Sequence, residues 1–322
     1  MMSRLTKHMR FLTPRIAARL AGNTLLTRCG VPRLRNAQLA LTHKCNHNCS
    51  FCSSSDLYDA GRMPLSVLDW TRLAADLRRL GCCHFDLTGG EPTTHPALLE
   101  IVDGVAGKDD AVVSLATNGK VVDRWLLSDL RQAGLTTILF NVQSDSAEEH
   151  DALVGDPGNW AHIMDLIPAA KMVRLAVCIN TCLTRSNWES VLGLVRLAEA
   201  RDIMLLVNLA APTGRMVHRD VRLTEYNCRL RLLEDASPNV RFDYSYCYRG
   251  RGLCPAGVEK LYVGAYGDVM PCTFSRRVFG NVRDEPVGNI WRRMVEEPML
   301  SGRSGCKHTF NPEYRAWLWE GA

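Results

Sequence analysis

Three closely spaced cysteines near the start of the chain constrain it more than any other feature. Residues 45–52 read CNHNCSFC, so that Cys45, Cys49 and Cys52 have the spacing C-x3-C-x2-C. Three thiolates this close can hold three irons of a [4Fe–4S] cubane and leave the fourth iron open to a ligand. A zinc site is the alternative, although zinc usually takes paired ligands from two segments and closes with four. The spacing therefore favours an iron–sulfur cluster that is itself a chemical site.

Composition places the chain among ordinary globular proteins. Of its 322 residues, 46% are hydrophobic and 23% are charged, which is the usual balance for a soluble protein. No apolar run reaches the length of a membrane span, and the N-terminus lacks the apolar stretch of a secretory signal. The 13 cysteines are odd in number, and a metal-type triplet among them indicates a reducing compartment rather than disulfides. We therefore expect a cytoplasmic protein with no membrane contact.

Positive charge is concentrated near the N-terminus. Nine Lys and Arg residues precede the first acidic residue, Asp56, and the rest of the chain carries 30 basic and 34 acidic side chains. The net charge of +5 thus reflects a basic N-terminal segment, residues 1–37, and not a basic fold. Three readings stay open for this segment: a surface helix packed on the rest of the protein, an organelle transit peptide, or a contact with nucleic acid or an anionic surface.

From residue 38 onward, short apolar runs alternate with helical patterns. Six runs are predicted to be strands: Gln38–Thr42, Phe85–Leu87, Val112–Ala116, Thr136–Val142, Val173–Asn180 and Ile203–Leu209. Helices are predicted between them, at Val67–Leu80 with Ser66 as its N-cap, Pro96–Val105, Arg124–Ala133, Trp160–Lys171 and Trp188–Ala200. Alternation of this kind implies an α/β fold of parallel βαβ units with right-handed crossovers. The candidate chemical residues follow the strand ends, where such folds place their sites.

The pattern changes beyond about residue 220. A last helical stretch, Leu223–Leu233, precedes a segment rich in Tyr, Arg, Gly and Cys that has no clear period. Two short apolar runs, Leu261–Val263 and Val269–Met270, then flank an AYGD turn and predict a β-hairpin. We therefore place a domain boundary near residue 235. It divides a large domain, 38–235, from a small α+β domain, 236–322.

Polar turns follow three of the predicted strands. The second strand is followed by GGEP at 89–92, the third by TNG at 117–119 and the fourth by QSD at 143–145. Adjacent glycines let a backbone approach a ligand closely. The acidic stretch 148–151 is either a pocket for a cationic substrate or a structural loop, and we favour the loop. Together with the cysteine triplet, these motifs in this order resemble the radical S-adenosylmethionine (SAM) enzymes.

This resemblance implies a fold, cofactors and site residues. The fold is a partial (β/α)6 TIM-type barrel, in which a [4Fe–4S] cluster on the three cysteines binds SAM. The residues expected to bind SAM are Phe51, Gly89, Gly90, Glu91, Pro92, Asn118, Ser144, Asn180 and Arg185. One electron then cleaves SAM, and the 5′-deoxyadenosyl radical takes a hydrogen atom from the substrate. A flavodoxin- or ferredoxin-type protein is the expected electron donor.

A second resemblance lies in the small C-terminal iron–sulfur domain. CPAG at 254–257 and GDVMPC at 267–272 resemble the start of the SPASM auxiliary-cluster domain. One cysteine follows, as in the shortened "twitch" version, which implies a second, auxiliary [4Fe–4S] cluster on Cys254, Cys272 and Cys306. Cys247 is either the fourth ligand or a catalytic hydrogen-atom donor. The six other cysteines are expected to be structural: Cys29, Cys82, Cys83, Cys178, Cys182 and Cys228.

The substrate follows from the resemblance alone. Members with a twitch domain act on aminocyclitols and aminoglycosides, on peptides, and on a purine nucleotide. No domain-sized leader-binding extension is evident, and the C-terminus lacks the two-glycine tail of the purine-cyclising members. We therefore expect a small polar natural-product substrate, an aminoglycoside or aminocyclitol, that is epimerised or oxidised by two electrons. A peptide maturase and a non-catalytic iron–sulfur protein are the alternatives, and no nucleic-acid partner is expected.

Overall fold

One ten-stranded sheet forms the framework of the computed structural model, which describes residues 13–107, 111–184, 187–217, 232–233, 235, 237–242, 253–301 and 311–319. The strand order is β10-β9-β8-β1-β2-β3-β4-β5-β6-β7. The strands are β1 (Asn36–Thr42), β2 (His84–Gly89), β3 (Val112–Thr117), β4 (Thr137–Asn141), β5 (Ala176–Leu183), β6 (Met204–Leu209), β7 (Val240–Phe242), β8 (Lys260–Val263), β9 (Asp268–Met270) and β10 (Gly280–Asn281).

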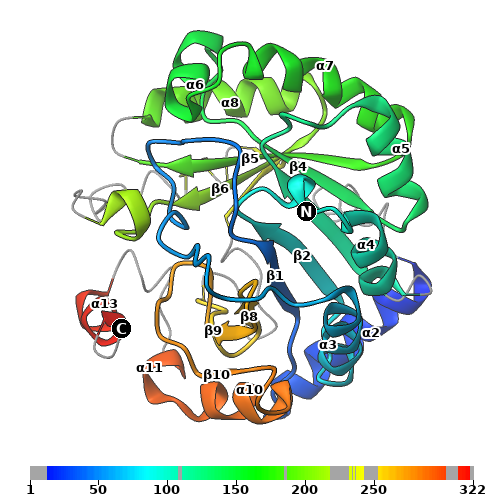
Figure 1. Ribbon diagram of the computed structural model, residues 1–322, viewed down its shortest axis with the longest axis vertical. Helices are drawn as coiled ribbons and strands as arrows, with labels where there is room; N and C mark the ends of the chain where they lie inside the picture. Colours follow the sequence, from blue (N-terminus) through cyan, green and yellow to red (C-terminus); the bar gives the residue numbers. More distant parts are fainter. Residues whose placement is uncertain are drawn as a thin grey trace.

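The first six strands are those that the sequence predicts. Each of β1 to β6 pairs in parallel with the next one along the chain, as helical crossovers require. The α-helices are α2 (Pro14–Arg28), α3 (Val67–Arg79), α4 (Leu98–Ala106), α5 (Arg124–Gln132), α6 (Ala147–Val154), α7 (Asn159–Met172), α8 (Trp188–Ala200), α10 (Val287–Glu296), α11 (Pro298–Ser301) and α13 (Pro312–Trp319). Short 3-10 helices η1 (Pro92–Thr94) and η2 (Gly214–Met216) follow β2 and β6. The sheet curves with α3–α8 outside it (Figure 1), so the predicted partial TIM-type barrel is confirmed.

Two helix starts show how local signals act. Ser66 caps α3 as predicted, and together with Asp69 it forms a capping box. The acidic stretch 148–151, for which we favour a loop, instead lies inside α6, so that prediction is wrong. Ser146 caps α6 by accepting a hydrogen bond from Glu149 N at 3.3 Å. Carboxylates in the first turn are favoured by the helix dipole, so the acidic run stabilises this helix start.

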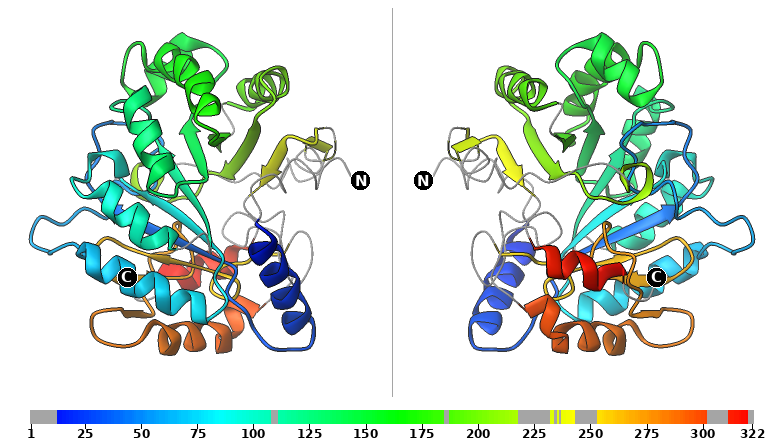
Figure 2. Two further views of the ribbon diagram at one scale, coloured as in Figure 1. Left: turned by 90° about the vertical axis from the view of Figure 1, so that its right-hand side faces the viewer. Right: turned by 90° about the vertical axis from the view of Figure 1, so that its left-hand side faces the viewer.

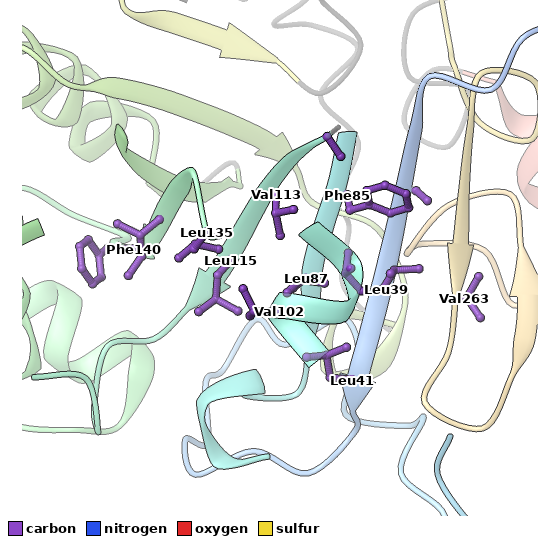
Figure 3. Packing of buried hydrophobic residues seen from close by; sticks show 14 of the residues in the cluster. Leu39, Leu41, Phe85, Leu87, Val102, Val113, Leu115, Leu135, Phe140 and Val263 are labelled. Carbon is purple, nitrogen blue, oxygen red and sulfur yellow. The ribbon is translucent and has the colours of Figure 1, made fainter. Parts of the chain in front are cut away.

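Alternation along the strands separates an outer apolar face from an inner polar face. The outer residues Leu39, Leu41, Phe85, Leu87, Val113 and Leu115 are buried in one hydrophobic cluster with helix residues such as Val102 of α4 (Figure 3). Because successive side chains point to opposite faces of a sheet, the residues between them face the inside of the barrel. This inner face carries Gln38, Asp86, Ser114, Asn141, Asn180 and Asn208.

The C-terminal segment extends the same sheet. β8 pairs in parallel with β1, the predicted β8–β9 hairpin is present, and β10 pairs antiparallel with β9. Helix α10 packs against α3, and Figures 1 and 2 show this segment at the end of the molecule opposite α6–α8. The boundary predicted near residue 235 therefore does not interrupt the sheet, and the division into domains stays a prediction. Most of the predicted helix Leu223–Leu233 lies outside the described residues.

Helix α2 packs on the protein through a buried side chain. Asn23 is 3% exposed, and its Nδ2 donates to Gly81 O at 2.8 Å. Arg33 Nε donates to the other amide atom, Asn23 Oδ1, at 3.1 Å. For residues 14–28 this geometry agrees with the surface-helix reading of the basic segment. No helix in the described ranges is long and apolar enough to cross a membrane.

Candidate active site

The cysteine loop begins where β1 ends, at the carboxyl edge of the parallel strands. Cys45 is exposed, and Cys49 and Cys52 are partly buried. Burial, with smaller contributions from Cys52 and Cys45, raises the pKa of the Cys49 thiol to about 12. The three sulfurs are thus close enough to affect one another's ionisation. A bound metal ion favours the thiolate form of cysteine. Binding of iron would therefore offset the repulsion between the negatively charged sulfurs.

The side chains of the triplet do not converge on one metal position. Among the described residues, no three His, Cys, Asp or Glu side chains come together closely enough to hold one metal ion. In a cubane each cysteine binds a different iron, so the thiolates need not converge on one point. The arrangement of the triplet is therefore compatible with a [4Fe–4S] cluster.

Two neighbouring elements hold the cysteine loop in place. Ser50 N donates to the carbonyl of Leu153 in α6 at 3.0 Å. Arg215 of η2 donates from its backbone N to Cys52 O at 2.9 Å and from its guanidinium to Cys49 O at 2.6 Å. These bonds use backbone carbonyls and not the sulfurs, so they position the loop without competing with iron.

The two glycines after β2 are required by the neighbouring chain. A Cβ on Gly89 would lie 2.1 Å from Thr42 O, and a Cβ on Gly90 would lie 2.1 Å from Lys44 O. Both carbonyls belong to the chain that enters the cysteine loop, and Gly90 N donates to Thr42 O at 2.6 Å. The sequence suggests that the glycines admit a ligand, whereas the structure shows that they admit this backbone. A main-chain contact between this turn and SAM stays a prediction.

Glu91 connects two turns from a buried position. Its side chain is 1% exposed. Oε1 accepts hydrogen bonds from Thr93 N at 3.0 Å, Thr93 Oγ1 at 2.5 Å and Thr117 Oγ1 at 2.7 Å, and Oε2 accepts from Asn118 N at 2.7 Å. Pro92 beside it is buried in η1. Glu91 therefore organises the turns after β2 and β3, and its predicted direct contact with SAM stays a prediction.

Asn118 lies beside the first cysteine. Its Nδ2 donates to Asn46 Oδ1 at 2.7 Å and lies 3.9 Å from Cys45 Sγ. Its Oδ1 accepts from Lys120 N at 3.0 Å. This position next to the cluster loop agrees with the predicted role in cofactor binding.

Phe51 packs in a small apolar cluster at the ends of β5 and β6. Its neighbours there are Cys182, Ala210 and Met216. The ring is partly buried, which suits a core residue and also an aromatic that contacts adenine. The contact with SAM stays a prediction.

Ser144 is engaged within the turn after β4. It is fully buried, its Oγ donates to Glu149 Oε2 at 2.6 Å, and the same Oγ accepts from Ser146 N at 3.0 Å. Ser190 of α8 donates to the same Glu149 oxygen at 2.6 Å. The hydroxyl thus shapes the start of α6, and its predicted contact with the SAM ribose stays a prediction.

A ladder of asparagines crosses the inner face of the sheet. Asn180 Nδ2 donates to Asn141 Oδ1 at 2.7 Å, and Asn208 Nδ2 donates to Asn180 Oδ1 at 2.5 Å. Asn180 is a predicted SAM contact, whereas Asn141 and Asn208 are not among the predicted site residues. The alternation of side chains along β4, β5 and β6 could have identified them, since Asn141, Asn180 and Asn208 all occupy inward positions.

A buried histidine joins two of the polar turns. His150 is fully buried, its Nδ1 accepts from Gln143 N at 3.1 Å, and its Nε2 faces Asn159 Oδ1 at 2.9 Å. Asn159 Nδ2 donates in turn to Asn118 O at 3.1 Å. Burial lowers the pKa of His150, so the neutral ring holds this connection. Sequence reasoning offers no signal for it.

Two of the predicted auxiliary ligands flank the β8–β9 hairpin. Cys254 is buried and Cys272 is partly buried. Gly257 N donates to Pro271 O at 3.2 Å, which ties the two cysteine-bearing segments together. Three further predicted site residues, Arg185, Cys247 and Cys306, lie outside the described residues.

Two family models match the chain. The "Radical SAM superfamily" model matches residues 39–198, which include the cysteine loop and the polar turns. The SPASM model, described as "Iron-sulfur cluster-binding domain", matches residues 254–308. Both matches agree with the resemblances seen in the sequence.

Similar proteins cover most of the chain. An "AdoMet-dependent heme synthase" from Methanosarcina barkeri is 25% identical over 83% of this chain and 87% of its own length. A "PqqA peptide cyclase" from Rhodopseudomonas palustris is 29% identical over 79% of this chain and 72% of its own length. The solved structure of Streptococcus suis SuiB bound to precursor peptide SuiA superimposes with a TM-score of 0.67 at 15% identity, over 92% of this chain and 69% of that one. At that identity the structural likeness concerns the fold.

Proposed function

Because the chain belongs to the radical SAM superfamily and carries a SPASM iron–sulfur domain, we propose that it modifies a peptide substrate by radical chemistry. The observation that carries the proposal is its likeness to peptide cyclases, 29% identical over 79% of the chain in one case. This substrate class is the first alternative of the sequence analysis. It replaces the aminoglycoside or aminocyclitol, which has no counterpart among the relatives described above.

The chain's own residues support two [4Fe–4S] clusters and SAM as cofactors. SAM bound at the cluster of Cys45, Cys49 and Cys52 supplies the radical that removes a hydrogen atom from the substrate. Glu91 fixes the turn beside this cluster, and Asn118 lies next to Cys45. The auxiliary cluster is expected in the SPASM domain, and a flavodoxin- or ferredoxin-type donor is the proposed source of electrons.

The inner face of the barrel favours a neutral substrate over a polycation. Among the inward positions of the described strands β1 to β6, Asp86 is the one residue with a carboxylate side chain. Asn36 Nδ2 donates to it at 2.6 Å, Ser114 Oγ donates to it, and His84 lies 3.0 Å away. The amino groups of an aminoglycoside would therefore lack free carboxylate partners there, which is costly in a closed site.

The same face also favours amides over a polyanion. The inward positions of the described β1 to β6 hold no Lys or Arg, the residues that pair with carboxylates. The strand register places Arg241 of β7 and Lys260 of β8 on the same face, but these residues are only 7% and 1% exposed. They do hold Gln38 and the ladder of Asn141, Asn180 and Asn208. Carboxamides both donate and accept hydrogen bonds, as peptide groups do. We therefore propose this ladder as a surface against which a peptide lies.

Modification of a tetrapyrrole is the second candidate. Its support is the heme synthase relative, which shares 25% identity across 87% of its own length. Heme and its precursors carry carboxylate side chains, and binding them calls for cationic residues. The inward positions of β1 to β6 supply none, and the two cations on the flanking strands, Arg241 and Lys260, are buried, so we favour the peptide.

For the reaction itself we propose a two-electron oxidation. Formation of an intramolecular cross-link would remove two hydrogen atoms from the peptide: SAM cleaved at the first cluster would supply the acceptor of one, and the other would leave as a proton and an electron. An auxiliary cluster held by Cys254 and Cys272 would accept that electron. Epimerisation needs a hydrogen donor instead, for which Cys247 stays the candidate. A Cys247→Ala variant that keeps both clusters but loses turnover would favour the donor role, whereas loss of iron would favour the ligand role.

The direct test is substrate turnover by the reconstituted, reduced enzyme with SAM. Short synthetic peptides encoded next to its gene, a carboxylated porphyrin and an aminoglycoside are incubated in parallel, and products are followed by mass spectrometry. We expect 5′-deoxyadenosine and one peptide lighter by two hydrogen atoms. The Cys45→Ala/Cys49→Ala/Cys52→Ala variant is the control and should form neither. Conversion of the porphyrin or the aminoglycoside alone would contradict the proposal.

A further inference from the structure

One arginine side chain reaches the residues next to two different cysteines. Arg276 lies in the loop after β9, four residues beyond Cys272. Its Nη2 donates to Ser53 O, the carbonyl that directly follows Cys52. Its Nη1 donates to Thr273 O, the carbonyl that directly follows Cys272, at 3.3 Å. A single planar group thus joins the two cysteine segments.

The other donors of Arg276 are also used. Nε donates to Asp56 Oδ2 at 2.9 Å, Nη2 donates to Asp56 Oδ1 at 2.8 Å, and Nη1 donates to Ser275 O at 3.1 Å. All five N–H groups of the guanidinium therefore have acceptors. The Arg276 side chain is 9% exposed and that of Asp56 is 41% exposed. A bidentate pair with one partner buried fixes geometry better than an exposed pair does.

Other contacts dock the same two segments at a greater distance from the cysteines. Arg62 donates to both carboxylate oxygens of Asp268, at 2.5 and 3.0 Å. The hydroxyl of Tyr266 accepts from Asp59 N at 2.9 Å and donates to Asp59 O at 2.7 Å. These contacts hold the hairpin against the loop without touching a residue adjacent to a cysteine. Loss of the Arg276 contacts therefore leaves the docking in place.

We propose that Arg276 is a positioning residue that couples the two cluster loops, so that formation of the auxiliary cluster orders the loop of Cys45, Cys49 and Cys52. The guanidinium is rigid and planar, so a change in the position of Thr273 is carried to Ser53 and Asp56. Such a coupling is reciprocal: the first cluster likewise favours order around Cys272. The inference depends on the two clusters and not on the identity of the substrate.

The test measures amide hydrogen exchange in the full chain of the Cys45→Ala/Cys49→Ala/Cys52→Ala variant. In this background only the auxiliary cluster forms, so protection of residues 50–60 reports the influence of that cluster alone. We expect reconstitution to slow exchange in this segment about tenfold, a change typical of a hydrogen bond to a charged group. Adding Arg276→Gln should reduce this slowing to less than about twofold. An undiminished slowing would overturn the proposal.

Arg293→Gln is the matched control. Arg293 is also bidentate, with Glu285 as its partner, and it donates to Phe279 O at 2.7 Å. It belongs to the same C-terminal segment but has no hydrogen bond to the cysteine loop among those described. This variant should keep the tenfold response, and a loss equal to that of Arg276→Gln would show a general effect of the domain and contradict the proposal.

Two further variants keep the test decisive. Arg276→Lys keeps the positive charge but lacks the planar guanidinium. If the geometry of the guanidinium carries the coupling, this variant should not restore the slowing of hydrogen exchange in residues 50–60. If Arg276→Gln does not load its cluster, Asp56→Asn replaces it, since Asp56 is half exposed and its neutral isostere keeps the fold. With Asp56→Asn, reconstitution should slow hydrogen exchange in residues 50–60 by only about threefold. A full tenfold slowing would overturn the inference. With both clusters present, the electron paramagnetic resonance spectrum of the first cluster should change with Arg276→Gln and not with Arg293→Gln.

Discussion

The carboxylate of Glu91 accepts the backbone N–H of Asn118 at 2.7 Å, so the turn after β2 and the turn after β3 are held as one unit. The side chain of Asn118 lies in turn 3.9 Å from the sulfur of Cys45. Glu91 is 1% exposed and therefore acts from beneath the site. The place of the first cysteine thus depends on a residue in a different loop.

Replacement of Glu91 by Gln tests this dependence. The new NH2 group faces donors instead of accepting from them, so we expect the free energy of unfolding of the apo chain to fall by about 1–3 kcal/mol. Urea denaturation measures the change. Glu100→Gln, on the exposed side of α4, should stay within about 0.5 kcal/mol of the wild type. Equal stabilities of the two variants would contradict the role assigned to Glu91.

A methyl group at Gly90 should displace the cysteine loop. It would lie 2.1 Å from Lys44 O, a backbone atom that cannot move aside cheaply. We expect Gly90→Ala to lower stability by about 1–3 kcal/mol and to reduce bound iron from about eight atoms to about four, since the auxiliary cluster remains. Iron analysis after anaerobic reconstitution measures this.

Gly22→Ala is the control for that substitution. Gly22 lies inside α2 with nothing within 4 Å of its would-be Cβ. Alanine there should stabilise the chain by about 0.5–1 kcal/mol and leave the iron content unchanged. A similar loss of iron in both variants would sink the steric explanation.

The buried His150 predicts a loss of stability in mild acid. Burial lowers its pKa in the folded chain below the ordinary value of 6.5. Above pH 6.5 the ring is neutral in both states, and its contribution to stability is complete. As the pH falls below 6.5 the unfolded chain takes up a proton first, so stability declines until the folded pKa is reached. Protonation would also remove the acceptor that Nδ1 offers to Gln143 N.

His150→Gln should remove this part of the pH dependence. Unfolding free energies at pH 7.5 and pH 5 are compared for the wild type and the variant, and the variant should show the smaller difference. The idea fails if His150→Gln and the wild type lose the same stability.

Removal of two auxiliary ligands should separate the two clusters. Cys254→Ala/Cys272→Ala is expected to bind about four iron atoms and the wild type about eight. The remaining cluster should still broaden its resonance spectrum on addition of SAM, because its cysteines are in another segment. A wild type with only four irons would contradict the auxiliary cluster.

The order of the strands and helices can be predicted from the sequence because capping residues and hydrophobic periodicity indicate the same elements. The six runs that become β1 to β6 occur in chain order, and Ser66 caps α3 as its position indicates. Glu148 and Glu149 lie in the first turn of α6, where the helix dipole favours carboxylates, a signal that the loop reading misses. Helices and strands that depend on residues close to one another in sequence can therefore be predicted.

The site is less predictable because its contacts join distant parts of the chain. The space at Gly90 is closed by Lys44 O, and two residues that accept hydrogen bonds from Arg276, Ser53 and Asp56, are more than 200 positions away in sequence. Neither relation leaves a local pattern. The asparagine ladder is an intermediate case, since periodicity places Asn141 and Asn208 inward but does not show that they touch.

The pairing of β1 with β8 joins two segments that are far apart in the chain. β1 carries the cysteine loop and has β2 on one side and β8 on the other. Roughly 220 residues separate Thr42 from Lys260, and a ribosome needs about 10–45 s to add them at its usual rate. During that interval β1 has an open edge of the kind that recruits other chains. The sheet beside the loop of Cys45, Cys49 and Cys52 is therefore completed only after β8 has been synthesised.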